Sequence, residues 1–374
     1  MTKLLAVVGA RPNFVKMAPL LDALEGDADV RLLHTGQHYD RALSDGLIER
    51  LGMRQPDANL GVGSGTHAEQ TAQVMVGVEK DLEEHSADAV LVAGDVNSTM
   101  AAALAAVKMH VPVAHVESGL RSRDWRMPEE VNRVVTDRVA DVLLCTSEDA
   151  VTNLAGEGIP LPQGAPGREA EDAPPHVALV GNTMIDSLVR ILDGVDREAV
   201  VAGQGLEDVD FALVTLHRPS LVDDPERFRP VIGILGALAV EMPVVFPAHP
   251  RTTARLEAAG VEIPEGIRLL EPMDYADFIA LEAEARLVIT DSGGVQEETS
   301  VLGVPCLTYR DSTERPITVE LGTNRLVGVD PDALDDAIAE EIAASTHSSP
   351  PEIPLWDGKA GPRAAQAVLE HLGR

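Results

Sequence analysis

Cysteine and lysine are scarce in this sequence, and long hydrophobic runs are absent from it. The two cysteines, Cys145 and Cys306, lie in apolar segments, so we expect both to be buried thiols. No stretch approaches the roughly 18 consecutive apolar residues of a membrane-spanning helix. The first apolar run ends at a Gly/Pro turn and does not resemble a secretory signal. A cytoplasmic protein is therefore expected.

The charge of the chain is strongly one-sided. Its 374 residues include 30 Lys and Arg against 61 Asp and Glu, a net charge of −31, and only five of the basic residues are lysine. Nucleic acids and anionic membranes need basic surfaces, so neither is expected as a partner. An acidic, lysine-poor surface also suggests adaptation to high salt, because carboxylates hold water and hydrated cations while salt screens their repulsion. The alternative is an ordinary protein of low isoelectric point.

Short apolar runs recur along the chain, and each is followed by a turn signal and a helix-length amphipathic segment. Most runs alternate poorly between apolar and polar residues, as buried parallel strands do. Two series of runs predict an α/β protein with two Rossmann-like, doubly wound domains. The first series covers 3–9, 30–35, 89–95, 112–117, 142–147 and 177–182, and the second covers 211–217, 243–249, 267–272, 286–292, 305–309 and 325–329.

The domain limits follow from these two series. We expect a first domain at residues 1–183, a second at 184–355 and a C-terminal helix at 356–374. Ligands bind outside the carboxyl ends of the strands in such sheets, and two facing sheets would form a cleft.

The turn after the first run has the features of an anion site. Arg11 and Lys16 lie in a helix that begins with Gly9-Ala10-Arg11-Pro12 directly after the strand. Free amide groups at a helix N-terminus attract anions, and proline fits there because it lacks the N–H. We interpret the turn as a phosphate site, although both cations could instead be ordinary surface residues.

A second glycine turn precedes a helix in the second series. Ser292, Gly293 and Gly294 follow a strand, and adjacent glycines let the backbone approach a pyrophosphate closely. Glu298 lies about one turn into the helix, where its carboxylate can accept both hydroxyls of a ribose. A nucleotide site is predicted here.

Three carboxylates converge on the carboxyl edge of the first sheet. Asp95 and Glu117 each close an apolar run, and Glu129 lies just beyond. Glu129 follows a proline, so it could merely favour a helix N-terminus. Arg133, one turn later, is a candidate ion-pair partner of Glu129.

Two histidines close runs of the second series. His217 and His249 fall at strand ends, where a histidine can supply a proton near neutral pH, although a structural histidine is the alternative. His34 and His38 have the spacing of helical metal ligands, but they bracket a turn and no Cys or carboxylate joins them. We expect no metal site.

Ten segments together resemble the non-hydrolysing UDP-N-acetylglucosamine 2-epimerases, in the order of that family. The combination of DSGGVQEE and RDSTERP is highly specific, whereas GARP alone is weak. The resemblance implies two Rossmann-like domains in the glycosyltransferase-B arrangement, with the C-terminal helix on the first. The segments are GARPNFVKMAP, HTGQHYD, AGDVNST, HVESGLRS, MPEEVNR, VGNTMID, LHRPS, DSGGVQEET, LGVPCLTYRDSTERPI and GTNRLVG.

The resemblance also implies a role for each matching residue. A second UDP-GlcNAc would bind a regulatory site at Gln37, His38 and His249. The residues around the sugar would be Lys16, Asp95, Glu117, Glu129, Arg133 and His217, while UDP would be held by Arg11, Phe278, Ser292, Gly293, Gly294, Glu298 and Arg315.

The implied reaction interconverts UDP-GlcNAc and UDP-ManNAc without metal or nicotinamide cofactor, in a protein that we expect to be a homodimer. The C2 proton is poorly acidic until UDP departs from C1, so carboxylates on both faces of C2 are needed. The alternatives are a hydrolysing epimerase that releases UDP and ManNAc, an epimerase of a modified UDP-amino sugar, a glycosyltransferase of the same architecture, and a catalytically silent nucleotide-sugar sensor. The three carboxylates argue against the sensor.

Overall fold

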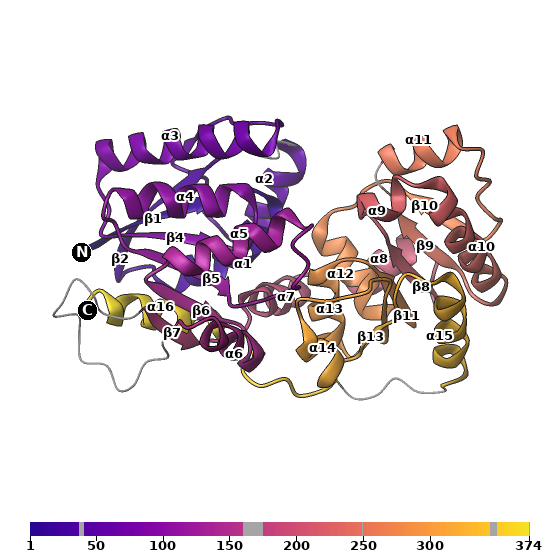
Figure 1. Ribbon diagram of the computed structural model, residues 1–374. Coiled ribbons are helices and arrows are strands. Elements are labelled where there is room, and N and C mark those ends of the chain that lie inside the picture. Colours follow the sequence, from indigo (N-terminus) through magenta and orange to yellow (C-terminus); the bar gives the residue numbers. More distant parts are fainter. Residues whose placement is uncertain (37–40, 160–174, 249, 345–349, 374) are drawn as a thin grey trace. The chain divides into compact units, whose positions relative to one another are not determined.

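The computed structural model describes residues 1–36, 41–159, 175–248, 250–344 and 350–373. The chain forms two compact units, Met1–Arg190 with Pro354–Arg374, and Ile191–Ile353 (Figure 1). None of the described helices is long and apolar enough to cross a membrane.

The described part of the first unit contains a seven-stranded parallel sheet in the order β3-β2-β1-β4-β5-β6-β7. The predicted runs of the first series coincide with six of its strands, and β3 was not predicted because it has only two residues. The strands are β1 (Thr2–Val8), β2 (Ala28–His34), β3 (Ala58–Asn59), β4 (Ala89–Ala93), β5 (Val113–Ser118), β6 (Val142–Cys145) and β7 (His176–Leu179).

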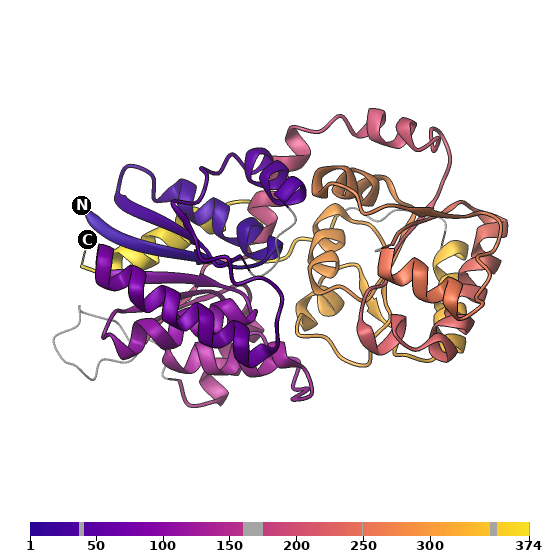
Figure 2. The same ribbon diagram turned by 90° about the horizontal axis from the view of Figure 1, so that it is seen from above.

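Helices cover both faces of this sheet. The helices α3 and α4 lie side by side (Figure 2), and their apolar side chains join the core over β1, β4 and β5. The C-terminal helix α16 packs on α1, β6 and β7. The helices of this unit are α1 (Arg11–Ala23), α2 (Arg41–Arg50), α3 (His67–His85), α4 (Asn97–Lys108), α5 (Pro128–Val139), α6 (Glu148–Gly156), α7 (Thr183–Asp193) and α16 (Ala360–His371).

Two contacts explain why α7 and α16 belong to the first unit. Ser187 of α7 donates a 2.7 Å hydrogen bond to the Val15 carbonyl of α1, so the unit extends to Arg190 and not only to residue 183. Asp186 accepts hydrogen bonds from the first amides of α16, including that of Gly361 at 2.7 Å. A Cβ at Gly361 would lie 2.5 Å from the Pro19 carbonyl oxygen, so glycine permits the close approach of α1 and α16.

The second unit contains a six-stranded parallel sheet in the order β10-β9-β8-β11-β12-β13 within the described residues. Its strands coincide with the second series of predicted runs, so the prediction of two doubly wound parallel sheets is confirmed. They are β8 (Ala212–Thr215), β9 (Val244–Pro247), β10 (Ile267–Leu270), β11 (Leu287–Thr290), β12 (Cys306–Thr308) and β13 (Asn324–Leu326).

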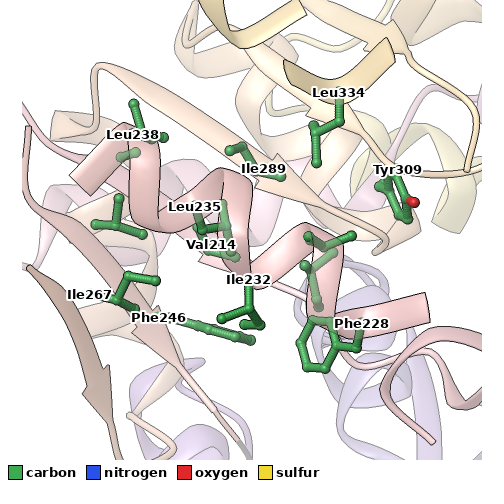
Figure 3. Close-up of a cluster of buried hydrophobic side chains, with 14 of the residues drawn as sticks. Val214, Phe228, Ile232, Leu235, Leu238, Phe246, Ile267, Ile289, Tyr309 and Leu334 are labelled. Atoms are coloured by element: carbon green, nitrogen blue, oxygen red, sulfur yellow. The ribbon is translucent and has the colours of Figure 1, made fainter. Parts of the chain in front are cut away.

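The core of the second unit lies between this sheet and the helices α10 and α15. Phe228, Ile232 and Leu235 of α10 point toward strand side chains such as Phe246 and Ile289 (Figure 3). On the other face, α12 and α13 pack over β8 and β11. The helices are α8 (Arg197–Gly203), α9 (Pro219–Val222), α10 (Pro225–Glu241), α11 (Pro250–Ala258), α12 (Tyr275–Glu284), α13 (Gly293–Leu302), α14 (Pro316–Glu320) and α15 (Pro331–Ala343).

Both cysteines are buried free thiols, as the sequence predicts. Burial raises the pKa of each of these thiols, Cys145 and Cys306, to about 12. Both therefore stay protonated and inert near neutral pH.

Candidate functional site

Lys16 and Glu117 form a buried ion pair at the carboxyl edge of the first sheet. Lys16 Nζ lies 2.7 Å from Glu117 Oε1, with side chains 6% and 2% exposed. A Cβ at Gly94 would lie 3.0 Å from Lys16 Nζ, so glycine leaves room for the ammonium group. Glu117 has a φ of 68°, a region that residues with a Cβ seldom adopt, and such strain is found mostly at functional sites. The anion site predicted at Lys16 thus already contains a carboxylate.

Arg133 holds two further carboxylates. Its guanidinium, 1% exposed, pairs with Asp95, which follows β4, and with Glu130. Glu130 also accepts hydrogen bonds from the backbone amides of Ser122 and Arg123, at 2.9 and 2.8 Å. These contacts bring Asp95 and Arg133 together.

The partner expected for Arg133 needs a correction. Glu129 is exposed in the first turn of α5, and the buried carboxylate next to Arg133 is that of Glu130. Both positions lie within one helical turn of Arg133, so spacing alone does not choose between them. The inward face of α5 decides, since Glu130, Asn132 and Arg133 are all buried.

Asn13 shapes the turn that carries Arg11. Its side-chain oxygen accepts hydrogen bonds from the amides of Gly9 and Ala10, at 3.1 and 2.8 Å, and its amide donates to the Ala93 carbonyl at 2.7 Å. Two backbone amides of this turn therefore donate to Asn13 and are not free to bind an anion. Arg11, half-buried at the start of α1, supplies the charge at this turn that can meet an anion.

Ser292, Gly293 and Gly294 open α13 in the second unit and remain partly exposed. Arg315 lies directly against this helix start, because a Cβ at Gly293 would be 2.4 Å from its guanidinium. The buried Arg315 is paired with Glu297 at 2.9 Å and with Glu314. The helix N-terminus and the guanidinium therefore lie together. Glu314 is also paired with Arg310, so the charges of the two arginines and the two glutamates balance.

Glu298 is the centre of a buried acidic group. It accepts a 2.5 Å hydrogen bond from the hydroxyl of Tyr275. Burial raises the pKa of Glu298, against the opposing effect of Tyr275. Burial and the nearby charge of Glu298 raise the pKa of Glu282, which is fully buried, well above its usual value. Phe278, on the same helix as Glu282, is half-buried at the margin of the core.

His217 is oriented by Asp291, a residue that the sequence analysis missed. Its Nδ1 lies 2.8 Å from Asp291 Oδ1, with side chains 59% and 1% exposed. Asp291 also accepts hydrogen bonds from the amides of His217 and Arg218, at 3.0 and 2.8 Å. Partial desolvation of the ring opposes its charged form, but the hydrogen bond and charge of Asp291 outweigh this effect and raise the pKa of His217. The sequence did contain a signal for Asp291, because this residue follows a predicted strand just as Asp95 does.

Three of the predicted site residues cannot be placed. Gln37, His38 and His249 lie outside the described residues.

The family model of UDP-N-acetylglucosamine 2-epimerase matches residues 22–369. The UDP-N-acetylglucosamine 2-epimerase of Methanocaldococcus jannaschii is 38% identical over 98% of this chain and 98% of its own. The chain belongs to the UDP-N-acetylglucosamine 2-epimerase family. The family suggested by the sequence motifs is thereby confirmed.

A solved structure and one further relative show the breadth of the epimerase family. A crystal structure of the Methanocaldococcus jannaschii enzyme in complex with UDP-GlcNAc and UDP has a TM-score of 0.86 at 37% identity, covering 99% of this chain and 100% of that one. The UDP-2,3-diacetamido-2,3-dideoxy-D-glucuronate 2-epimerase of Pseudomonas aeruginosa is 36% identical, covering 100% of this chain and 99% of its own. The family thus includes epimerases of a modified sugar.

Proposed function

We propose that this epimerase interconverts UDP-GlcNAc and UDP-ManNAc by a non-hydrolysing route. The observation that carries the proposal is the pair of carboxylates, Asp95 and Glu117, at the ends of the adjacent strands β4 and β5, each held by a buried cation. Two fixed carboxylates are what inversion at C2 requires, one to remove a proton and one to deliver it. The similarity to an enzyme crystallised with UDP-GlcNAc and UDP supports this substrate class.

In the proposed reaction, the bond between C1 and the diphosphate oxygen breaks first and leaves oxocarbenium character at C1. A carboxylate then takes the C2 proton, which produces UDP and 2-acetamidoglucal. A proton returns to C2 from the opposite face, and the diphosphate oxygen re-forms its bond to C1. Positioned cations and amides stabilise the departing diphosphate, a contribution commonly worth about 3–4 kcal/mol per donor.

In the first unit, the residues proposed for the sugar are Lys16, Asp95, Glu117, Glu129 and Arg133, and Arg11 is the cation proposed for the diphosphate. In the second unit, the residues proposed for UDP are those at the start of α13, Glu298, Arg315 and Phe278, the last of them for the uracil, and His217 is the proposed proton donor. The pairing of Arg315 with Glu297 and Glu314 supports a role for its guanidinium in positioning the helix start.

Proton NMR of the reaction in D₂O tests the chemistry. We expect UDP-GlcNAc to yield UDP-ManNAc with UDP still attached and one deuterium at C2, because the returning proton comes from solvent. Accumulation of free UDP and ManNAc would establish the hydrolysing reaction instead.

A modified UDP-amino sugar is the second candidate substrate, favoured by the similarity to the Pseudomonas aeruginosa enzyme. The two are separated by comparing kcat/KM for UDP-GlcNAc with that for the 2,3-diacetamido glucuronate analogue. If kcat/KM is higher for the analogue, the modified sugar is the substrate and UDP-GlcNAc is not.

A further inference from the structure

Glu282 lies on the buried face of α12, where the other buried residues are apolar. Ala276, Ile279, Ala280, Leu281 and Glu282 are all 0% exposed. Within the described part of the chain, no N–H or O–H group donates to either carboxyl oxygen of Glu282. An ionised carboxylate at this position would be removed from water without a donor, and a buried group in that situation takes up a proton instead.

The carboxyl group next to Glu282 is that of Glu298 in α13. Tyr275 and Glu282 are seven residues apart on α12, which places them on the same face of the helix. Glu298 interacts with both, because its carboxylate accepts a 2.5 Å hydrogen bond from the Tyr275 hydroxyl. Two neighbouring carboxyl groups that are removed from water do not both ionise, since like charges repel. The pair of Glu282 and Glu298 therefore holds a proton.

The surroundings place that proton on Glu282. Burial raises the pKa of both carboxyl groups, but the Tyr275 hydroxyl and the charge of Arg315 oppose this effect at Glu298. At Glu282 the neighbouring charge of Glu298 adds to the effect of burial, so its pKa is raised well above the usual value. Glu298 is thus the better anion of the two, and Glu282 is the better acid.

The other titratable groups close to Glu282 leave this balance unchanged. Tyr275 stays neutral, because burial raises the pKa of its hydroxyl well above the usual value. The Cys306 thiol on β12 is also neutral, because burial raises its pKa to about 12. Glu297, whose charge acts on Tyr275, is paired with Arg315 at 2.9 Å.

Charged side chains on the outer side of α12 are directed elsewhere. On α8, which packs against α12, Arg197 and Glu198 are exposed to solvent. Arg197 pairs with the exposed Glu284 at 2.8 Å. Arg286, one turn after Glu282, donates a 2.9 Å hydrogen bond to a backbone carbonyl of α15.

We propose that Glu282 is a positioning residue, a neutral carboxylic acid that donates its proton to Glu298 and so orients the Glu298 carboxylate for the ribose of UDP. A carboxylate has about four acceptor positions. Tyr275 and Glu282 occupy two of them, which leaves as many positions as a ribose has hydroxyls at C2 and C3. The positioning role rests on the proposed function, whereas the protonation of Glu282 does not.

Infrared difference spectroscopy near neutral pH tests the protonation. The C=O stretching band of a protonated carboxyl group lies at higher frequency than the bands of peptide groups and ionised carboxylates. We expect the native protein to show such a band that is missing from Glu282→Gln. Glu298→Gln should retain it, because Glu282 stays buried there. If Glu282→Gln lost no band of this kind, or if the band disappeared from Glu298→Gln alone, the proposal would be overturned.

Two substitutions of Glu282 test the positioning role through UDP binding, measured by calorimetry. The side-chain amide of Glu282→Gln can still donate to Glu298, so its Kd for UDP should stay close to the native value. Glu282→Leu has no donor, and we expect its Kd to rise about tenfold, the effect of one hydrogen bond to a charged group. Glu284→Gln, at the exposed glutamate of the same helix, is the matched control and should keep both the infrared band and the UDP affinity.

Stability and kinetics separate positioning from a merely structural role. Leucine at position 282 removes a buried polar group from an apolar face, so the Tm of Glu282→Leu should not fall. Its KM for UDP-GlcNAc should rise while kcat stays unchanged, because the ribose is held equally in the ground state and the transition state. A Tm that falls together with the UDP affinity in this variant would contradict the positioning role.

Failure of this inference and failure of the proposed function give different results. If the native protein binds UDP and Glu282→Leu binds it equally well, only the positioning role is wrong. If the native protein binds no UDP, the proposed function and the positioning role are both wrong. The infrared band decides the protonation of Glu282 in either case, because it requires neither ligand nor turnover.

Discussion

Lys16 and Glu117 form an ion pair whose charged ends are both removed from solvent. Removing one partner of such a pair leaves an uncompensated buried charge, which commonly costs about 3–5 kcal/mol. We therefore expect Glu117→Gln to lower the free energy of unfolding by about that amount, measured by urea denaturation. Its kcat should also fall by about 10²–10⁴, the usual cost of losing a general acid or base.

The double variant Lys16→Met/Glu117→Gln separates these two effects. It removes both charges, so we expect it to regain most of the stability lost in Glu117→Gln and none of the activity. If the double variant were as unstable as the sum of the two single variants, the pair would not be energetically coupled.

His217 and Asp291 supply a prediction about pH. The pKa of His217 is raised above its usual 6.5, so its contribution to folding is complete below that pH and is lost as the pH rises through the folded-state pKa. Asp291→Asn should bring the NMR titration midpoint of His217 down. The free energy of unfolding of this variant should also no longer decrease as the pH rises through the folded-state pKa of His217 in the native protein. A midpoint that does not move would mean that Asp291 does not control this histidine.

The start of α13 supplies a prediction at the scale of elements. In Gly293→Ala the new Cβ would lie 2.4 Å from the Arg315 guanidinium and 2.8 Å from Glu314, so these side chains must shift away from the helix N-terminus. We expect weaker UDP binding by about tenfold, roughly 1.4 kcal/mol, measured by calorimetry.

Gly233→Ala in α10 is the matched control for that change. Nothing lies within 4 Å of the position where its Cβ would be, and Gly233 is exposed. Alanine in a helix interior should stabilise the protein by about 0.5–1 kcal/mol and leave UDP binding unchanged. Equal UDP affinities for the two variants would contradict a diphosphate site at α13.

Net charge dominates the behaviour of the whole molecule. The chain carries a charge of −31, and one of its five lysines, Lys16, is buried in an ion pair. At 1 M ionic strength the Debye length is about 3 Å, against about 10 Å at 0.1 M, so repulsion among surface carboxylates is strongly relieved. We expect the Tm to rise up to molar KCl, and activity to pass through an optimum because salt also weakens UDP binding.

A KCl series with Tm and initial rates measures this response, and salts of weakly hydrated cations at equal ionic strength are the control. Stabilisation by screening alone would level off near 1 M and would be the same for all the cations. Hydration by carboxylates would keep raising the Tm beyond 1 M and would distinguish KCl from salts of weakly hydrated cations. Equal stability at 0.1 M and 2 M KCl would contradict adaptation to salt.

The sequence by itself determined the strands and the edge of the sheet where polar groups gather. Buried parallel strands need continuous apolar runs, so the runs ending at Asp95, Glu117 and His217 were visible without coordinates. Strand ends of a parallel sheet share one edge, which is why Asp95 and Glu117 were expected at the same edge, and the adjacent strands β4 and β5 do place them there. The family was equally accessible, because its motifs are local.

Only the tertiary structure decided which charges meet. Lys16 and Glu117 are 101 residues apart, and His217 and Asp291 are 74 apart, so no local spacing joins them. The choice of Glu130 over Glu129 depended on which face of α5 is buried. These pairings follow from burial, because a charged group removed from water needs a partner of opposite charge. Which group is that partner depends on the tertiary fold.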